Sequence, residues 1–238
     1  MEINADFTER AVVHTSQIEW APSPMAGVTR RMLDRVGDEV ARATSIVRFD
    51  SGSTFQMHAH DGGEEIFVLE GTFSDEHGDF GPGHYFRNQK GTSHTPFTNE
   101  GCTIFVKLWQ FRDGDTASIK IDTEAASFSP GMVSGLSVLP LHQFGTESAA
   151  LVRWQPGTYF NPHTHFGGEE IYVIEGTFQD EFGSYPKGTW IRSPHRSVHT
   201  PFSDEGCLIY VKVGHLLEEH GTLSDPRERR IPSLLGSA

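Results

Sequence analysis

The chain has 238 residues, a length that allows one large domain or two small ones. Its 19 Lys and Arg residues against 32 Asp and Glu residues give a formal net charge of -13. This charge argues against a nucleic-acid partner and against an anionic membrane surface, because both require a basic face on the protein. With 11% aromatic residues, 25 Gly and 13 Pro, the composition favours a globular fold of short strands and many turns.

The N-terminus and the cysteines indicate the compartment. Residues 1–6 contain neither the basic start nor the apolar core of a signal peptide, and no apolar run approaches the roughly 18 residues of a membrane span. Two cysteines are too few for a disulfide scaffold or a Cys-rich zinc site. We therefore predict a cytoplasmic protein.

Residues 46–107 recur as residues 151–212 without a gap, at a constant spacing of 105 residues. Roughly half of the aligned positions are identical, which indicates a tandem repeat. The repeat predicts two domains of ordinary size, at 21–110 and 131–213. The other residues are interpreted as an N-terminal extension (1–20), a connector (111–130) and a C-terminal tail (214–238).

Short β-branched and aromatic runs, separated by turn signals, predict strands within each repeat. In the first repeat they lie at 44–49, 65–69 and 103–109, and their copies follow 105 residues later. This pattern predicts an all-β fold in which each repeat is a sandwich or a small barrel. Within the repeats, only residues 28–36 have a spacing compatible with a helix. We also expect a strand at 118–121 in the connector and a short helix at 216–221 in the tail.

Three histidines and one glutamate recur at matching positions of the two repeats. His58 and His60 are two residues apart on a strand-like segment, so both imidazoles point to one face. A Gly-Gly turn then brings Glu64 beside them, and His94 comes from a later strand. Three imidazoles and one carboxylate suit a divalent transition metal such as Zn, Fe, Mn or Ni. The sequence therefore predicts one metal per repeat, with the ligand sets His58, His60, Glu64, His94 and His163, His165, Glu169, His199.

A shared polar core network without metal is the alternative explanation for these sets. It is disfavoured because both repeats keep all four residues while neighbouring positions differ, as at Ser93 and Val198. Four protein ligands would complete a tetrahedral zinc site, and they would leave two positions open on an octahedral metal.

Other repeated polar residues are interpreted as structural. Glu65 and Glu170 alternate with the metal-site glutamates and should face the opposite side of their strand, where an ion-paired role is expected. The repeated arginines are expected to pair with these carboxylates, with the binding of an anionic ligand as the alternative; they are Arg48, Arg153, Arg87 and Arg192. Cys102 and Cys207 are expected to be buried free thiols rather than redox sensors.

Seven histidines lie outside the two predicted ligand sets. His195 precedes His199 by four residues but has no histidine counterpart in the first repeat, so we do not expect it to be a ligand. The remaining six are expected at the surface: His14, His77, His84, His142, His215 and His220.

The metal-type residues lie in a pattern that resembles the first motif of the cupin superfamily. The second cupin motif is matched more loosely, by Pro186 and Gly188 followed by His199 at a longer spacing than in the common form. The amino-acid sequence of both repeats is similar to that of the cupin domain of ChrR-type anti-sigma factors. It also resembles the sequences of the acetylacetone-cleaving dioxygenases among the cupins. The first motif reads Gly52-x5-His58-x-His60-x3-Glu64-x6-Gly71, and its copy runs from Gly157 to Gly176.

This resemblance implies a bicupin: two tandem double-stranded β-helix (jelly-roll) barrels, each with a metal inside. The interior would be walled by residues such as Phe55, Ile66, Val68 and Phe105, and it could hold a small-molecule ligand. Cupins commonly pair, so a homodimer is a further expectation.

Three functions are consistent with the resemblance. The first is a regulatory or sensor module like the ChrR cupin. Residues 1–20 contain His14 but no cysteine, so we do not expect the helical zinc domain through which ChrR-type proteins bind a sigma factor, nor sigma-factor binding by that route. The second is an Fe(II)-dependent dioxygenase acting on a small dicarbonyl-like compound. The third is a bicupin whose metals only stabilise the fold. The sequence singles out no general base and leaves enzymatic activity open.

Overall fold

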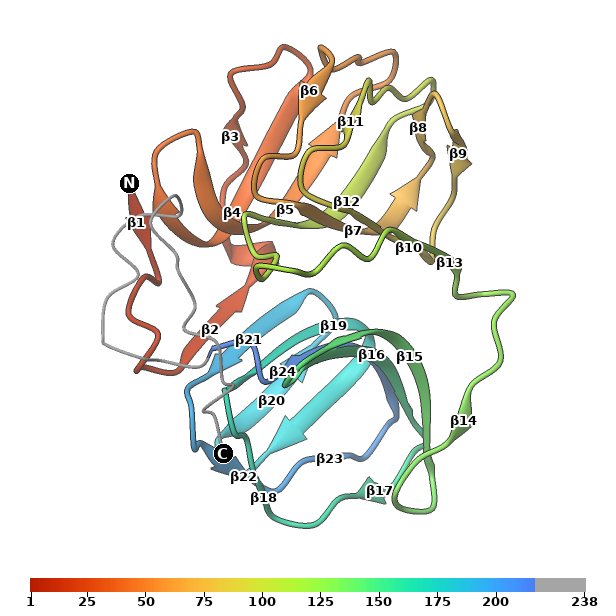
Figure 1. Ribbon diagram of the computed structural model, residues 1–238. Coiled ribbons are helices and arrows are strands. Elements are labelled where there is room, and N and C mark those ends of the chain that lie inside the picture. Colours follow the sequence, from red (N-terminus) through yellow and green to blue (C-terminus); the bar gives the residue numbers. More distant parts are fainter. Residues whose placement is uncertain (217–238) are drawn as a thin grey trace. The chain divides into compact units, whose positions relative to one another are not determined.

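Antiparallel β-sheets make up nearly all the regular structure of the computed structural model, which describes residues 1–216 (Figure 1). The chain divides into two units. The first contains Met1–Ala5 and Ala21–Lys120, and the second contains Asp6–Trp20 and the described residues from Ile121 onward. Within residues 1–216 there is no α-helix, only the 3-10 turn η1 (Thr15–Gln17), and hence no helix long and apolar enough to cross a membrane. The predicted all-β fold with two tandem units is confirmed.

The first unit is built on one large sheet and two small ones. Its strands are β1 (Glu2–Ile3), β3 (Ala21–Pro22), β4 (Val28–Gly37), β5 (Ala41–Phe49), β6 (His58–Ala59), β7 (Glu64–Gly71), β8 (Phe73–Asp75), β9 (Gly78–Phe80), β10 (His84–Asn88), β11 (Ser93–His94), β12 (Cys102–Leu108) and β13 (Ile119–Asp122). The large sheet has the order β1-β4-β5-β12-β7-β10-β13, with β3 paired to β4. Strands β6 and β11 form one small sheet, and β8 and β9 form the other.

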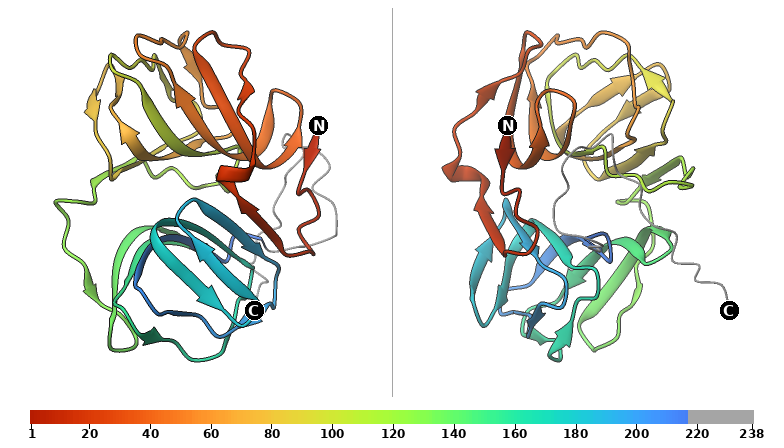
Figure 2. Two further views of the ribbon diagram at one scale, coloured as in Figure 1. Left: turned by 180° about the vertical axis from the view of Figure 1, so that it is seen from behind. Right: turned by 60° about the vertical axis from the view of Figure 1, so that its left-hand side comes forward.

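The second unit repeats this arrangement. Its strands are β2 (Ala11–His14), β14 (Ser129–Pro130), β15 (Leu136–Phe144), β16 (Glu147–Trp154), β17 (Thr158–Tyr159), β18 (His163–Thr164), β19 (Glu169–Asp180), β20 (Gly183–Pro186), β21 (Thr189–Ser193), β22 (Val198–His199), β23 (Phe202–Ser203) and β24 (Cys207–Val213). The main path runs β14-β15-β16-β24-β19-β21-β2, and β18 pairs with β22. Figure 2 shows from two further sides that the strands of each unit curve around its interior.

The edge strands of the two sheets come from segments outside the repeats, and one of them, β13, is the strand expected in the connector. In the first unit, β13 from the connector lies beside β10. In the second unit, β2 lies beside β21, with Val12 opposite Ile191. Strands β10 and β21 are equivalent in the two repeats, so β2 and β13 cover the same edge of their respective sheets. Part of the segment interpreted as an N-terminal extension is therefore a structural strand of the second unit.

The helix considered for residues 28–36 is wrong, because these residues form the long strand β4. A register shift between Met32 and Asp34 interrupts its pairing with β5. Such a bulge breaks the two-residue alternation, so Val28, Leu33 and Val36 are all buried although their spacing is not that of a regular strand.

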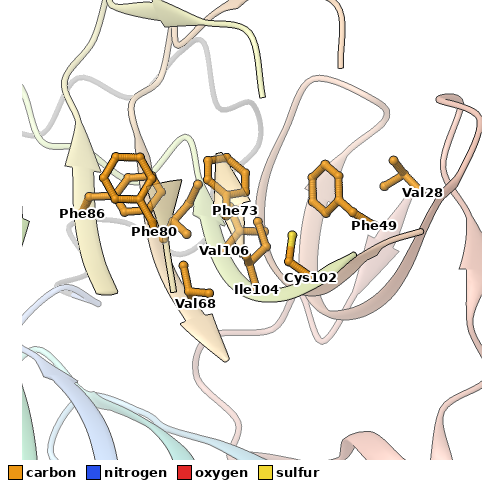
Figure 3. Packing of buried hydrophobic residues seen from close by; sticks show 10 residues of the cluster. Val28, Phe49, Val68, Phe73, Phe80, Phe86, Cys102, Ile104 and Val106 are labelled. Atoms are coloured by element: carbon orange, nitrogen blue, oxygen red, sulfur yellow. The ribbon is translucent and has the colours of Figure 1, made fainter. Parts of the chain in front are cut away.

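Each unit encloses an apolar core on one face of its large sheet. In the first unit the core contains Phe49, Ile66, Val68, Phe73, Phe86, Ile104 and Val106 (Figure 3). Phe55, which is partly buried, packs against this core. The expected interior position of Phe105 is wrong. Phe105 alternates with Ile104 and Val106 along β12 and faces the other side of the sheet, where it is opposite Phe67 and only 2% exposed.

Both cysteines are buried free thiols, as expected. Burial raises the pKa of Cys102 and of Cys207 to about 11. At pH 8 the thiolate fraction of each should therefore be about 100-fold smaller than that of an unperturbed cysteine, and a thiol reagent should label the native protein at least that much more slowly. The labelling rate should rise as the pH approaches 11, and denaturant should expose both thiols at once. Rapid labelling of the native protein at pH 8 would contradict this burial.

Candidate metal centres

The first candidate centre gathers His58, His60, Glu64 and His94 around one point. His58 in β6 lies opposite His94 in β11, so both imidazoles leave the same face of this small sheet. His60 follows β6, and Glu64 begins β7 after the Gly-Gly turn. Gly63 in this turn has a φ of 76°, and a Cβ there would lie 2.0 Å from the Phe111 ring, so the turn requires glycine. The four ligand atoms all lie within 4.8 Å of one another.

The second candidate centre has the same construction. His163 in β18 lies opposite His199 in β22, and Glu169 begins β19. The ligand atoms of His163, His165, Glu169 and His199 also lie within 4.8 Å of one another. In each set one histidine, His58 or His163, is half-buried and the other three residues are buried. The structure thus brings together the four residues predicted in each repeat.

Every histidine of the two sets has its Nδ1 atom engaged by a group outside the set. The carbonyl and carboxylate partners can only accept, so the Nδ1 atoms of the four imidazoles facing them act as donors. Thr92 Oγ1 donates to the Gln89 carbonyl and is free to accept from His60. The Nδ1 contacts are His58 to Gln56 O (3.1 Å), His60 to Thr92 Oγ1 (3.0 Å), His94 to Asp75 Oδ2 (3.1 Å), His163 to Asn161 O (3.0 Å), His165 to Ser197 Oγ (3.1 Å) and His199 to Asp180 Oδ2 (3.4 Å).

In the second set His165 Nε2 and His163 Nε2 lie 2.9 Å apart, so one of the two donates a hydrogen bond to the other. The remaining contacts leave the Nε2 atoms of the neutral imidazoles as lone-pair donors directed at the centre of each set. Among residues 1–216, three of them are buried without a hydrogen-bond partner: His60 Nε2, His94 Nε2 and His199 Nε2. Buried polar atoms without a partner are costly, and a cluster of them is explained when a further group satisfies them. A divalent metal would do so, because metal-bound imidazoles typically donate their other nitrogen to a carboxylate or carbonyl. The residues present therefore fit a transition-metal ion.

The two glutamates have different electrostatic surroundings. Burial alone would raise the pKa of Glu64, but the nearby His60 and His94 imidazoles, together with the hydrogen bond from Asn88, lower it to about 2. Burial, together with the negative charge of Asp180, raises the pKa of Glu169 to about 7, and His199 and Arg10 offset this only in part. The His60 Nε2–Glu64 Oε2 distance is 3.2 Å, whereas the distances from Glu169 to His165 Nε2 and His199 Nε2 are both 3.5 Å.

The residues that hold the proposed ligands were not predicted from the sequence. Asp75 and Asp180 are 105 residues apart, as are Thr92 and Ser197, so the repeat itself carried a signal for them. Asn88 was also missed. Its Nδ2 atom donates to Glu64 Oε2 at 3.0 Å, and its counterpart in the second repeat is serine, so no repeated pattern marked it.

The repeated acids and bases on the opposite face have structural partners. Glu65 lies opposite Arg87 in the sheet, and Arg87 donates to Asp115 at 2.8 Å. Glu170 accepts from Trp190 Nε1 at 2.7 Å. In the second unit Arg192 stacks over Phe7 and donates to the Asp6 carbonyl. Arg48 and Arg153 are exposed.

Among the histidines outside the sets, His77 is exposed and His14 and His84 are half-buried. His195 accepts from the Gly167 amide at 2.8 Å and lies outside the metal cluster. The surface prediction is wrong for His142, which follows a bulge in β15 that turns it inward, and for His215, whose Nε2 contacts the buried Glu170 at 3.1 Å. His220 and the helix expected at 216–221 lie outside the described residues, apart from Leu216, which is not helical.

The fold and the paired sites define the class as a bicupin. A family model described as the ChrR cupin-like domain matches the chain twice, over residues 8–112 and 116–217. The protein therefore belongs to the ChrR cupin-like family. A comparison with curated protein sequences gave no significant match.

Several solved structures share this fold at low sequence identity. A dioxygenase candidate from Nostoc punctiforme has a TM-score of 0.75 and 16% identity, over 90% of this chain and 86% of that one. The protein Ylba from E. coli has a TM-score of 0.68 and 15% identity, over 91% and 95%. A mutant of Bacillus subtilis oxalate decarboxylase has a TM-score of 0.58 and 14% identity, over 89% and 79%.

Proposed function

We propose that this bicupin binds one divalent transition-metal ion in each unit, with Zn, Fe, Mn and Ni as the ions that suit the donor set. The observation that carries the proposal is the convergence of imidazole Nε2 atoms and one carboxylate, with each Nδ1 already engaged elsewhere. The ligand sets are His58, His60, Glu64, His94 and His163, His165, Glu169, His199. A bound ion would act as a Lewis acid toward a small ligand at its open positions.

The residues around each centre orient the imidazoles and surround them with aromatic rings. In the first unit Asp75 and Thr92 hold His94 and His60 in one tautomer, so their Nε2 lone pairs need no rearrangement. The Phe55 ring lies 5.4 Å from the His58 ring, and the Phe73 ring lies 5.9 Å from the His94 ring. These aromatic neighbours restrict water at the centre. His58 is only half-buried, so the centre is reached on its side.

We infer a regulatory or sensor role for the protein, supported by its membership of the ChrR cupin-like family. Metal analysis of protein purified without chelator tests the metal binding on which both candidate functions depend. Content well below one ion per chain after reconstitution would exclude it. A small ligand that shifts the thermal midpoint of the metal-loaded protein, and not of the stripped protein, would support sensing through the metal.

A metal-dependent dioxygenase is the second candidate. It is supported by the aromatic surroundings of the ligands and by the shared fold with the Nostoc punctiforme dioxygenase candidate. The Fe(II)-loaded protein would then consume O2 in the presence of a 1,3-dicarbonyl compound such as acetylacetone. Uptake no faster than that of the same iron without protein would reject this candidate and leave the sensor role.

If such activity is found, we expect the two units to contribute unequally, because their linings differ. Trp154 replaces Phe49, and Tyr185 replaces Phe80, in the two cores. His60→Ala and His165→Ala, each checked for folding, should then lower O2 uptake to different extents. Equal losses in the two variants would show that the centres share the reaction.

A further inference from the structure

We propose that the two centres fill in order: the first unit binds the metal more tightly, because Asn88 fixes its glutamate and the second unit has a serine there. This inference rests on the proposed metal binding. It adds an affinity ranking and names Asn88 as a positioning residue.

A hydrogen bond orients the glutamate of the first centre. Asn88 lies at the end of β10, directly opposite Glu64 in β7. Its Nδ2 atom donates to Glu64 Oε2 at 3.0 Å. The same oxygen faces His60 Nε2 at 3.2 Å and His94 Nε2 at 3.4 Å. The carboxylate is therefore held with one oxygen directed at the centre before any ion arrives.

A serine occupies the equivalent position of the other repeat. Ser193 lies opposite Glu169, as Asn88 lies opposite Glu64, but its side chain is shorter. Glu169 directs one oxygen to each neighbouring histidine, with Oε1 at 3.5 Å from His165 Nε2 and Oε2 at 3.5 Å from His199 Nε2. Within residues 1–216, this Oε2 atom is buried and has no hydrogen-bond partner. The second carboxylate is thus divided between two imidazoles and is not fixed.

A second difference acts in the same direction. Asp75 Oδ2 accepts from His94 Nδ1 at 3.1 Å. In the second unit Asp180 Oδ2 is shared, because Arg10 donates to it at 2.8 Å while His199 Nδ1 is 3.4 Å away. Tyr185 donates to the other oxygen of Asp180 at 2.8 Å, whereas the first repeat has Phe80 at that position. Asp180 is therefore engaged by Arg10 and Tyr185, and it holds His199 less closely than Asp75 holds His94.

These contacts predict an affinity difference of about tenfold or more, since the loss of one outer hydrogen-bond partner of a metal ligand typically costs 10- to 100-fold in affinity. At limiting metal only the first centre would be filled. The second centre would respond at higher free metal concentration, which gives a sensor a graded range.

The test is a Co(II) titration of the full chain after removal of metal by a chelator, with a competing chelator of known affinity to fix the dissociation constants. His199→Ala retains only the first centre, and His94→Ala retains only the second. We expect a Kd about tenfold or more lower for His199→Ala than for His94→Ala, and a two-phase titration of the wild type. Equal constants, or a tighter second centre, would overturn the ordered filling.

The role of Asn88 is tested by Asn88→Ser in the His199→Ala background. The Kd of the first centre should rise about tenfold and its Co(II) absorption spectrum should change, while the metal-free protein remains folded. Asn99→Ser, at an exposed position of the same unit, is the matched control and should alter neither reading. An unchanged Kd in Asn88→Ser would remove Asn88 from the explanation. If the wild type binds no Co(II) at either centre, the proposed function itself is refuted, and the ordered filling with it.

Discussion

Replacing His94 by alanine is expected to lower the metal content of the reconstituted protein from two ions per chain to one. His94 is one of the four proposed ligands of the first centre, and its Nε2 atom is buried without a protein hydrogen-bond partner in the described part of the chain. Three remaining ligands should bind much more weakly, so dialysis should remove the ion from this unit alone. His199→Ala should empty the second unit in the same way. Elemental analysis of the dialysed proteins measures both results.

The same variants should lose the stability that the ion contributes. A ligand present at 100 to 1,000 times its Kd stabilises the folded state by about 3 to 4 kcal/mol. The thermal midpoint of wild-type protein should therefore rise on metal addition, and part of that rise should disappear in His94→Ala. His84→Ala is the matched control, because His84 lies in the same unit with its Nδ1 on the Gly81 carbonyl and outside the ligand set. Full retention of two ions in His94→Ala would contradict the assignment of this residue.

Gly71→Ala is expected to destabilise the first unit by about 2 to 4 kcal/mol, one of the larger effects of a single added methyl group. Gly71 ends β7 with a φ of 70°, and a Cβ at this position would lie 2.1 Å from the Gly101 carbonyl oxygen. The atom in the way is backbone, so β12 would have to move away from β7. A decrease of roughly 10 °C or more in the thermal midpoint of this unit is expected.

Gly81→Ala is the control for that experiment. Gly81 lies in the same unit, its φ is not positive, and no atom lies within 4 Å of an added Cβ. This substitution should change the free energy of unfolding by no more than about 1 kcal/mol. If Gly71→Ala and Gly81→Ala behave alike, the close approach at Gly71 does not limit the fold. Gly176 has the same geometry, with a Cβ 2.1 Å from the Gly206 carbonyl oxygen, so it should repeat the result in the second unit.

The close approach at Gly71 also explains why the motif that ends at this residue predicted the local structure of the site. Gly52, His58, His60, Glu64 and Gly71 occur at fixed spacing because a strand, a tight turn and a second strand must bring three ligands to one point. Such local geometry depends on residues close in sequence, so two-residue alternation and turn signals were sufficient to predict it. The repeat added His94, because the same residue recurred 105 positions later.

Contacts across the sheet cannot be predicted from local sequence patterns. The role of Asn88 depends on the register that places it opposite Glu64, and a register is decided by the pairing of whole strands. Arg10 reaches Asp180 only because β2 pairs with β21, far away in the chain. The burial of His142 and the strand at 28–36 each depend on a bulge, which shifts which side chains face inward without any residue type that marks it.

The sequence by itself determined the two tandem β units, the two sets of four ligand-type residues and the family resemblance, because repetition and local spacing encode them directly. Only the tertiary structure decided that the Nδ1 atoms are engaged and the Nε2 atoms converge, and that the two glutamates are held differently. Those features depend on distances between strands that are remote in the chain, and hydrogen bonds are sensitive to differences of a few tenths of an ångström. Two centres with the same types of ligand residue therefore differ in the contacts that support those residues.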